Sequence, residues 1–263
     1  MFRGFNLKMI GYNSEEPGFQ DLYRVGIESY KENASNVKRE LDEFLSPDGV
    51  INASAMQAAW FNEAQYDIFL SHSHSNKDLA VALAGYFWKY FRLTTFVDSC
   101  IWGHSDILLR RIDEEYRQDG KRNFDYGLRN ISTSHVHMML ASALSKAIDN
   151  CECLIFLNTP ESVSTDDVME QTASPWIYYE LSVSTTIRQS KPRHLKTCAK
   201  ALGGDGILKN ASISGWRYDL PYGHLADIDI DDVRRWRDLY DDINRLLRRR
   251  MVFKVLYDMV DGK

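Results

Sequence analysis

One short segment carries residue types and a spacing that could do chemistry. Trp176 and Glu180 are four positions apart, so in a helix they lie one turn apart and on the same side. Tyr179 stands between them and adds another aromatic ring. A carboxylate beside a semi-apolar wall can stabilise positive charge that develops on a bound molecule, because such surroundings strengthen the attraction. The alternative is a tryptophan packed in the core and a solvated glutamate near a helix start.

Further candidate residues follow two apolar runs, at 66–71 and 94–97, that read as strands buried on both faces. Ligands of a parallel sheet bind beyond the carboxyl ends of its strands, so polar residues at these points can meet a ligand. A hydrogen-bonded loop and a tryptophan packed on the surface are the alternatives for the two segments. The candidate residues here are Ser71, His72, Ser73, Asp98 and Trp102.

The elements that must position these residues alternate between strand and helix. A third apolar run, at 153–157, reads as another buried strand, and helical patterns separate the three runs. Strand and helix alternating at these lengths predict right-handed βαβ units, and therefore an α/β fold with a parallel sheet flanked by helices. The expected helices span 79–91, 106–117, 136–148 and 175–189.

The regions on either side of this block read as helical. Apolar residues recur at helical spacing over 17–45 and 54–62, so we expect an N-terminal helical extension. Asp229–Arg250 reads as one helix, since acidic residues at its start and arginines at its end match the helix dipole. Glycine and asparagine residues indicate an irregular insert near 119–134. The expected organisation is a helical extension over 1–64, an α/β domain over 65–220 and a helical segment over 221–263.

Composition excludes several classes of protein. The 263 residues carry a formal net charge of −5, with 44% hydrophobic and 26% charged residues, which is ordinary for a soluble globular protein. The longest nearly apolar stretch, 79–93, is interrupted by Lys89 and Arg92, so no membrane span is expected. Mild acidity, and aspartates among the arginines near 234–250, argue against nucleic acid as a partner. Four cysteines without a signal peptide indicate a cytoplasmic protein with reduced thiols.

Two closely spaced pairs of possible metal ligands are His135 with His137 and Cys151 with Cys153. Zinc sites use wider spacings, and a helix over 136–148 separates the two histidines. We therefore expect no metal, with buried thiols and hydrogen-bonded histidines as the simpler interpretation. The chain has no glycine-rich phosphate loop of the Walker or dinucleotide type, so neither an NTPase nor a hydride-transfer enzyme is supported.

Three segments resemble the signature segments of one family when they are taken in order. Tyr66–Ser73 (YDIFLSHS), Thr95–Asp98 followed by Trp102, and Ser174–Leu181 (SPWIYYEL) are similar to three segments of Toll/interleukin-1 receptor (TIR) domains. These are the first strand, the second strand with its functional loop, and a later element in which a tryptophan precedes a glutamate. The likeness covers about residues 65–190. The added N-terminal region, the insert and the long loop before the third segment are more similar to bacterial than to receptor TIR proteins.

The resemblance implies a flavodoxin-like sheet, the TIR fold, and in enzymatic members the cleavage of NAD at the nicotinamide–ribose bond. NAD is then a substrate, and no separate cofactor is implied. Some members release ADP-ribose, and others cyclise it or attach it to another acceptor. Bacterial members act in antiphage defence, Thoeris systems among them, by making a nucleotide signal for a separate effector. The resemblance also implies a homo-oligomer whose protomers share active sites, with Trp102 crossing to the neighbour.

The chemistry of NAD cleavage suits the tryptophan–glutamate segment. Nicotinamide departs as a neutral molecule and needs no general acid, so the difficult species is the oxocarbenium-like ribose, which one carboxylate can stabilise. The resemblance makes Glu180 that carboxylate, with Trp176 stacked on the nicotinamide or holding the ribose. The rival hypothesis is a scaffold that binds other TIR domains without turnover, but retention of both residues favours the enzyme. The other residues expected at the substrate site are Ser71, His72, Ser73, Asp98, Trp102 and Tyr179.

Overall fold

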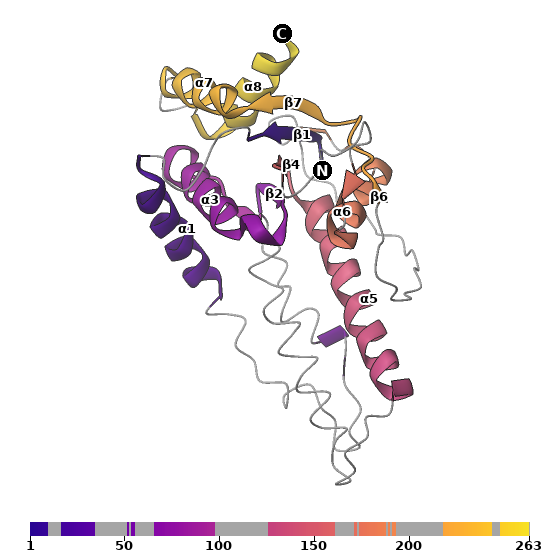
Figure 1. Ribbon diagram of the computed structural model, residues 1–263. Coiled ribbons are helices and arrows are strands. Elements are labelled where there is room, and N and C mark those ends of the chain that lie inside the picture. The colour runs from indigo at the N-terminus through magenta and orange to yellow at the C-terminus, as the bar shows by residue number, and fades with distance from the viewer. Residues whose placement is uncertain are drawn as a thin grey trace.

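Strands and helices alternate along most of the chain (Figure 1). The computed structural model describes residues 1–9, 17–34, 52, 54–55, 66–97, 126–160, 171–172, 174–187, 189, 191–192, 218–243 and 248–262. The expected helix over 106–117 lies outside these residues. Of the expected helix over 54–62, the structure describes only residues 54 and 55, which are helical.

The core of the fold is a five-stranded sheet in which every pair of neighbours is parallel. Its order is β3-β2-β4-β1-β7, and helices cover both faces. The predicted α/β fold with a parallel sheet is therefore confirmed, as are the three strands predicted from apolar runs. The five strands are β1 (Arg3–Lys8), β2 (Ile68–Ser71), β3 (Thr95–Val97), β4 (Cys153–Asn158) and β7 (Ala226–Asp229).

The strand order reverses at β2. Along the chain β2 leads to its neighbour β3 on one side, and the next strand, β4, pairs with β2 on the other side. The order of these three strands is the one that begins a flavodoxin-like sheet. The position beside β4, which the next strand takes in that sheet, is occupied here by β1. Ligands of open α/β sheets bind at such a reversal, outside the carboxyl ends of the strands.

The N-terminal residues correct the expectation of a helical extension over 1–64. β1 pairs with β4 on one side and β7 on the other, so it lies inside the sheet. Phe5 and Leu7 are fully buried on one face, and Asn6 is buried on the opposite face. The polar Asn6 interrupts what is otherwise a typical buried strand, which removed the apolar-run signal from the sequence. Helix α1 (Phe19–Ala34) confirms the helical part of that expectation where it is described.

The helices form one layer on each face of the sheet (Figure 1). Helices α3, α7 and α8 pack against Phe5, Leu70 and Ile155 on one face, and α1 covers α3. Helices α5 and α6 cover the other face, which carries Phe69 and Phe156. Among the described residues, none of the helices combines the length and apolar character needed to cross a bilayer. The helices are α3 (Lys77–Phe91), α5 (Tyr126–Asn150), α6 (Pro175–Thr186), α7 (Ile230–Asp241) and α8 (Arg248–Asp261).

Two glycines let α1 and α3 cross at close range. A Cβ atom added at Gly85 would lie 1.9 Å from the carbonyl oxygen of Leu22, and one added at Gly26 would lie 2.1 Å from that of Val81. Backbone atoms cannot give way as a flexible side chain can, so glycine is required at both positions. The first helix is thus packed tightly against the α/β core.

Two other expectations are wrong. The insert near 119–134 was expected to be irregular, but its described part is helical, since α5 begins at Tyr126 and continues to Asn150. Residues 119–125 lie outside the described residues. The single helix expected over Asp229–Arg250 is two helices, α7 and α8. Trp236 Nε1 donates a hydrogen bond of 2.8 Å to the carbonyl of Val252, 16 residues later. Sixteen residues of one straight helix would span about 24 Å, so this contact requires a turn between two helices.

Candidate functional site

Two of the predicted site residues meet at the carboxyl end of β2. Ser71, the last residue of the strand, donates a hydrogen bond from its Oγ to Oε2 of Glu180 on α6, at 2.5 Å. The two residues are 109 positions apart, and both side chains are buried, with 0% of each residue exposed. The pair therefore lies beside the reversal of strand order between β2 and β4, where ligands of such sheets bind.

Local sequence explains why α6 presents Glu180 to the sheet. Ser174 caps the helix, because its Oγ accepts a hydrogen bond from the backbone N–H of Ile177, and Pro175 occupies the first turn. Ile177 and Leu181 are buried against the sheet in the same cluster as Phe156. They lie on either side of the turn that carries Glu180, so the apolar face of α6 brings a carboxyl group into the protein interior.

A buried carboxyl group is costly unless hydrogen bonds replace the water that it loses. The Ser71 contact lies in the short range typical of a hydroxyl bound to a carboxylate. A buried acid with a specific hydrogen-bond partner is a candidate functional group. The alternative of a solvated glutamate at a helix start is excluded by the complete burial of Glu180.

His72 and Ser73 continue from the same strand end. His72 is 3% exposed, and its Nδ1 lies 3.3 Å from the carbonyl oxygen of Leu70. Ser73 accepts a backbone hydrogen bond from Asn76, which closes the short 3₁₀ helix η2 (His74–Asn76). The Asn76 side chain donates to Thr159 Oγ1 at 2.6 Å and so joins the segments that follow β2 and β4. Sequence reasoning missed Asn76 and Thr159, which lie within a few residues of the ends of the strands predicted at 66–71 and 153–157.

The two predicted aromatic residues lie against α5. The ring of Trp176, which is half-buried, meets the ring of His137 edge to face, with centroids 5.8 Å apart. The hydroxyl of Tyr179 donates to the carbonyl of Ala141 at 2.9 Å and lies 2.6 Å from Ser145 Oγ. Both residues thus dock α6 on α5 in this conformation. Burial lowers the pKa of His137, so its ring is neutral at pH 7.

Two predicted residues, Asp98 and Trp102, lie outside the described residues. Of the two pairs of possible metal ligands, His135 and His137 lie on α5. Cys151 and Cys153 are buried free thiols. In the part of the chain that the structure describes, no three histidine, cysteine, aspartate or glutamate side chains come together as a metal site.

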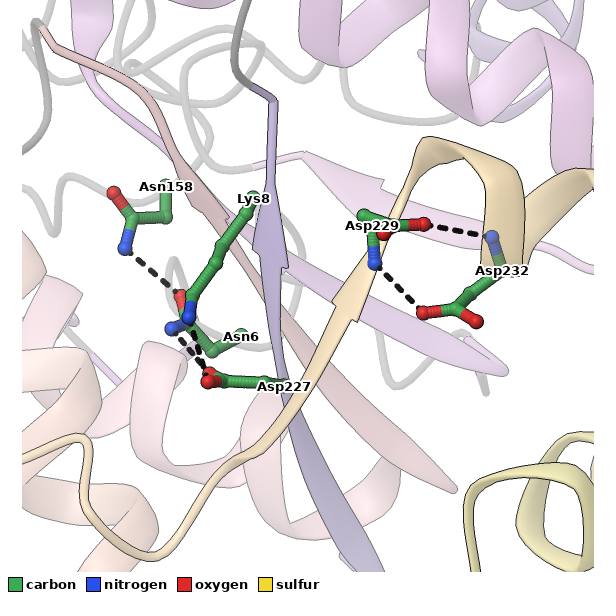
Figure 2. A network of polar contacts seen from close by, with 6 residues as sticks. All are labelled: Asn6, Lys8, Asn158, Asp227, Asp229 and Asp232. Atoms are coloured by element: carbon green, nitrogen blue, oxygen red, sulfur yellow. Dashed lines mark hydrogen bonds and ion pairs between the residues drawn. The ribbon is translucent and has the colours of Figure 1, made fainter. Parts of the chain in front are cut away.

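A second set of polar side chains, which sequence reasoning missed, connects three strands near their carboxyl ends (Figure 2). Asn158 Nδ2 donates to Asn6 Oδ1 at 3.1 Å, and Asn6 Nδ2 donates to Asp227 Oδ1 at 2.8 Å. Lys8 Nζ donates to the other oxygen of Asp227 at 2.6 Å. These residues form a continuous chain of polar contacts from β4 through β1 to β7. The signal available in the sequence was a buried-type strand interrupted by a polar residue, at Asn6.

Strand register places these polar contacts in line with the Ser71–Glu180 pair. Ser71 and Asn6 both align with Phe156 of β4, one from each side, and Asn6 aligns with Asp227. Aligned residues of neighbouring parallel strands point to the same face, so these side chains share the face covered by α5 and α6. Ser71 and Asn6 are separated by one strand, which corresponds to about 10 Å.

The two carboxyl groups near the carboxyl ends of the strands, Asp227 and Glu180, differ in their exposure to solvent. The hydrogen bond from Lys8 lowers the pKa of the Asp227 carboxyl, with a smaller effect from Asn6, against an opposing effect of burial. Asp227 is therefore ionised at neutral pH and exposed, whereas Glu180 is enclosed. In this conformation the exposed charged groups at this edge are the Asp227 carboxylate and the Lys8 ammonium, whereas Ser71 and Glu180 are buried.

A partly open cavity among the described residues lies at another place, between α1, α3 and α7, and none of the predicted site residues lines it. Ser71 and Glu180 themselves are fully buried. No protein-family model, curated protein or solved structure shows significant similarity to this chain.

Proposed function

We propose that this protein is a TIR-type enzyme that cleaves the nicotinamide–ribose bond of NAD. The observation that carries the proposal is the buried contact between Ser71 and Glu180 beside the reversal of strand order. The sequence resemblance singles out the same glutamate as the catalytic carboxylate. The expected product is ADP-ribose or a cyclised or conjugated form of it, which would act as a signal for a separate effector in bacterial antiphage immunity.

In this mechanism Glu180 acts by its charge. As the bond breaks, nicotinamide leaves with the bonding electron pair and becomes neutral, and positive charge spreads over C1′ and the ring oxygen of the ribose. A carboxylate in a site that excludes water stabilises this cation strongly. The hydroxyl of Ser71 holds one carboxylate oxygen in place, so that the group is oriented before the substrate arrives.

Access to Glu180 requires a conformational change, because none of the residue's surface is exposed. Besides its apolar face on the sheet and the Ser71–Glu180 bond, α6 is held on α5 by two hydrogen bonds of Tyr179 and by the ring contact of Trp176. Release of these aromatic side chains would open the helix face and free the rings to contact the substrate. This change is the step that we assign to self-association of the protein through TIR contacts.

The rival function is a non-catalytic TIR scaffold, and the complete burial of Glu180 is the observation that favours it. In that case the Ser71–Glu180 bond only fixes α6 on the sheet. The two functions differ in turnover, so an assay of NAD consumption separates them.

The test is incubation of the purified protein with NAD over a wide range of protein concentrations, with nicotinamide release followed by chromatography. Turnover that is lost in Glu180→Gln supports the enzyme. The matched control is Glu152→Gln, which changes a second buried glutamate far from the proposed site. Lack of turnover in the assembled wild-type protein at every concentration would favour the scaffold.

A further inference from the structure

A cavity of about 190 Å³ lies between α1, α3 and α7, on the face of the sheet opposite Glu180. Figure 1 shows α1 beside α3, with α7 near one end of the pair. The volume is roughly that of six water molecules in the liquid, which fits a compact organic molecule. Leucine and isoleucine side chains form part of the wall, and cationic side chains form another part. The lining residues used below are Leu22, Leu83, Ile230, Lys89, Arg234 and Arg237.

Tyr86 supplies a hydrogen-bond donor in the wall of this cavity. The residue is 9% exposed, and among the described residues its buried hydroxyl has no hydrogen-bond partner. A buried polar group left in this way destabilises a protein by about 1–3 kcal/mol. Burial raises the pKa of Tyr86 to about 12, so the hydroxyl keeps its proton at neutral pH and can donate it. The hydroxyl oxygen itself is inaccessible to solvent, so a ligand that accepts this bond must first displace the side chains that cover it, and the bond then removes the cost.

Charges of both signs act on the same hydroxyl. Arg237 and Arg234 both line the cavity, and their positive charges act on the Tyr86 hydroxyl together with the opposing charge of Asp238. Arg237 lies over the ring of Tyr90 at 5.4 Å and uses its Nε and one terminal nitrogen to bind Asp238. Those two bonds engage two of the five N–H donors of a guanidinium group.

The acidic partners of the arginines offset part of this field, but they do not line the cavity. The side chains of Asp238 and Asp231, which bind Arg237 and Arg234, are 66% and 81% exposed, so solvent screens them. Lys89 adds a third cation to the lining, and Asp21 is the acidic residue that lines the cavity. Asp21 is itself bound by Arg24 at 3.4 Å. The balance at the cavity favours a negatively charged ligand.

We propose that this cavity is a binding site for a small organic anion. An acidic oxygen of the ligand accepts the hydrogen bond of Tyr86 and lies next to Arg234 and Arg237, and a compact apolar body packs against Leu22 and Leu83. The site is separate from Glu180, since Tyr86 belongs to the apolar cluster on one face of the sheet and Glu180 is on the other. The inference therefore stands or falls independently of NAD cleavage.

The experiment is a titration of the full chain by calorimetry and by NMR with four probes: benzoate, phenyl phosphate, inorganic phosphate and the neutral benzamide. We expect saturable binding of benzoate or phenyl phosphate, and the stronger of the two identifies the acidic group. Benzamide and inorganic phosphate should bind far more weakly, because one lacks the charge and the other the apolar body. Equal binding of benzamide, tighter binding of inorganic phosphate than of both organic anions, or no saturable binding of either organic anion would overturn the proposal.

Tyr86→Phe removes the hydroxyl and keeps the ring. Without ligand, this variant should melt at the same or a higher temperature than the wild type, because it removes a buried hydroxyl with no partner. Its affinity for the organic anion should fall roughly tenfold or more, since a hydrogen bond to a charged group is lost. The control Tyr90→Phe removes a hydroxyl from the same cavity where the residue is only half-buried, and it should lose much less affinity.

Arg234→Gln is the second variant, and it keeps the test independent of Tyr86. It should weaken binding and reduce the dependence of the affinity on salt concentration. Unchanged affinity in both Tyr86→Phe and Arg234→Gln would show that the anion does not occupy this cavity, and would refute the assignment.

Discussion

Two buried glutamates in this protein each accept a hydrogen bond from a hydroxyl group, but they lie at opposite ends of the strands. Glu180 receives Ser71 Oγ at the carboxyl end of β2, and Glu152 receives the hydroxyl of Tyr257 at 3.1 Å just before β4 begins. Their exposed fractions are 0% and 1%. Burial and hydrogen bonding are therefore alike, and position in the sheet is what differs.

The surroundings of Glu152 are those of a structural contact. Its partner Tyr257 stacks on Phe5 and Phe253, with ring centroids 6.1 Å apart in each case. Burial raises the pKa of Tyr257, so the phenol keeps its proton and remains a donor. The bond ties α8 to the amino end of the sheet. The carboxyl end, by contrast, carries Glu180 and, on strands further along the same face, the polar contacts of Asn6 and Asp227. This is the end where open α/β sheets bind ligands. The comparison teaches that two acids alike in burial differ in their place in the topology, and the proposed function rests on the one at the carboxyl end.

The strongest test of the comparison is the exchange of each glutamate for glutamine. Glu180→Gln should reduce NAD consumption on the order of 100-fold or more, because one electrostatic contact to the cationic transition state is lost. Glu152→Gln should leave the rate close to that of the wild type. Nicotinamide release and circular dichroism on the same samples separate activity from folding. Equal loss of activity in the two folded variants would mean that position does not distinguish the two acids.

Self-association should raise the NAD-cleaving activity that we assign to the carboxyl end of the sheet. We expect the specific activity to rise with protein concentration, and Trp102→Ala to lower it while the monomer stays folded, since aromatic anchors dominate such contacts. Sedimentation velocity and nicotinamide release over one dilution series provide the measurement. A monomeric enzyme whose specific activity stays flat across the series would contradict this mechanism.

Removal of the hydroxyl donors should affect stability at both ends. Ser71→Ala and Tyr257→Phe each remove a hydrogen bond to a buried carboxyl group, and each should lower the free energy of unfolding by about 1–3 kcal/mol. Urea denaturation at pH 7 measures the change. Tyr178→Phe is the control, because Tyr178 is 36% exposed and should show little effect. A neutral Ser71→Ala would indicate that the bond to Glu180 adds nothing to the folded state.

The smallest effect is expected from the exposed carboxyl of Asp227. Its pKa is lowered in the folded protein, so its contribution is present above the unfolded pKa of about 3.9 and is lost as pH falls through the folded value. Lys8 and Asp227 have side chains 45% and 60% exposed, which limits the contribution to a few tenths of a kcal/mol. The difference in unfolding free energy between the wild type and Asp227→Asn, followed from pH 7 to pH 2, should shrink toward zero. A difference that grows as the pH falls would have the wrong sign.

The sequence predicted the strands whose side chains are apolar on both faces of the sheet. β2, β3 and β4 are short apolar runs buried on both faces, so their positions were predictable. β1 and β7 were not, because Asn6 and Asp227 break the pattern and their strand conformation depends on neighbours far along the chain. The local trace of such tertiary pairing is weak, because a strand interrupted by a polar residue does not stand out as an apolar run.

The candidate site shows the same limit. Residue type and place in the chain were enough to select Ser71 and Glu180, but not to show that they bind each other. Trp176 and Tyr179 were expected to face a ligand, whereas the structure uses them to fasten α6 to α5. A helix with apolar neighbours on several sides gives no sequence signal for which side an aromatic ring will choose, because packing decides it.

The position of β1 has a consequence for how the chain folds. Asn6 bonds to Asn158, which lies 152 positions further along the chain, and to Asp227, which lies 221 positions further along. Strand β1 therefore cannot pair with β4 or β7 until most of the polypeptide has been synthesised. Until then its unpaired backbone and buried-type side chains are available to other chains, as in any unprotected strand. Long-range pairing of this kind also slows folding, because the entropy of closing a long loop is lost before the contacts repay it. Completion of the sheet therefore waits for β7, and a nascent chain that stops before residue 226 holds an open edge where β1 should be covered.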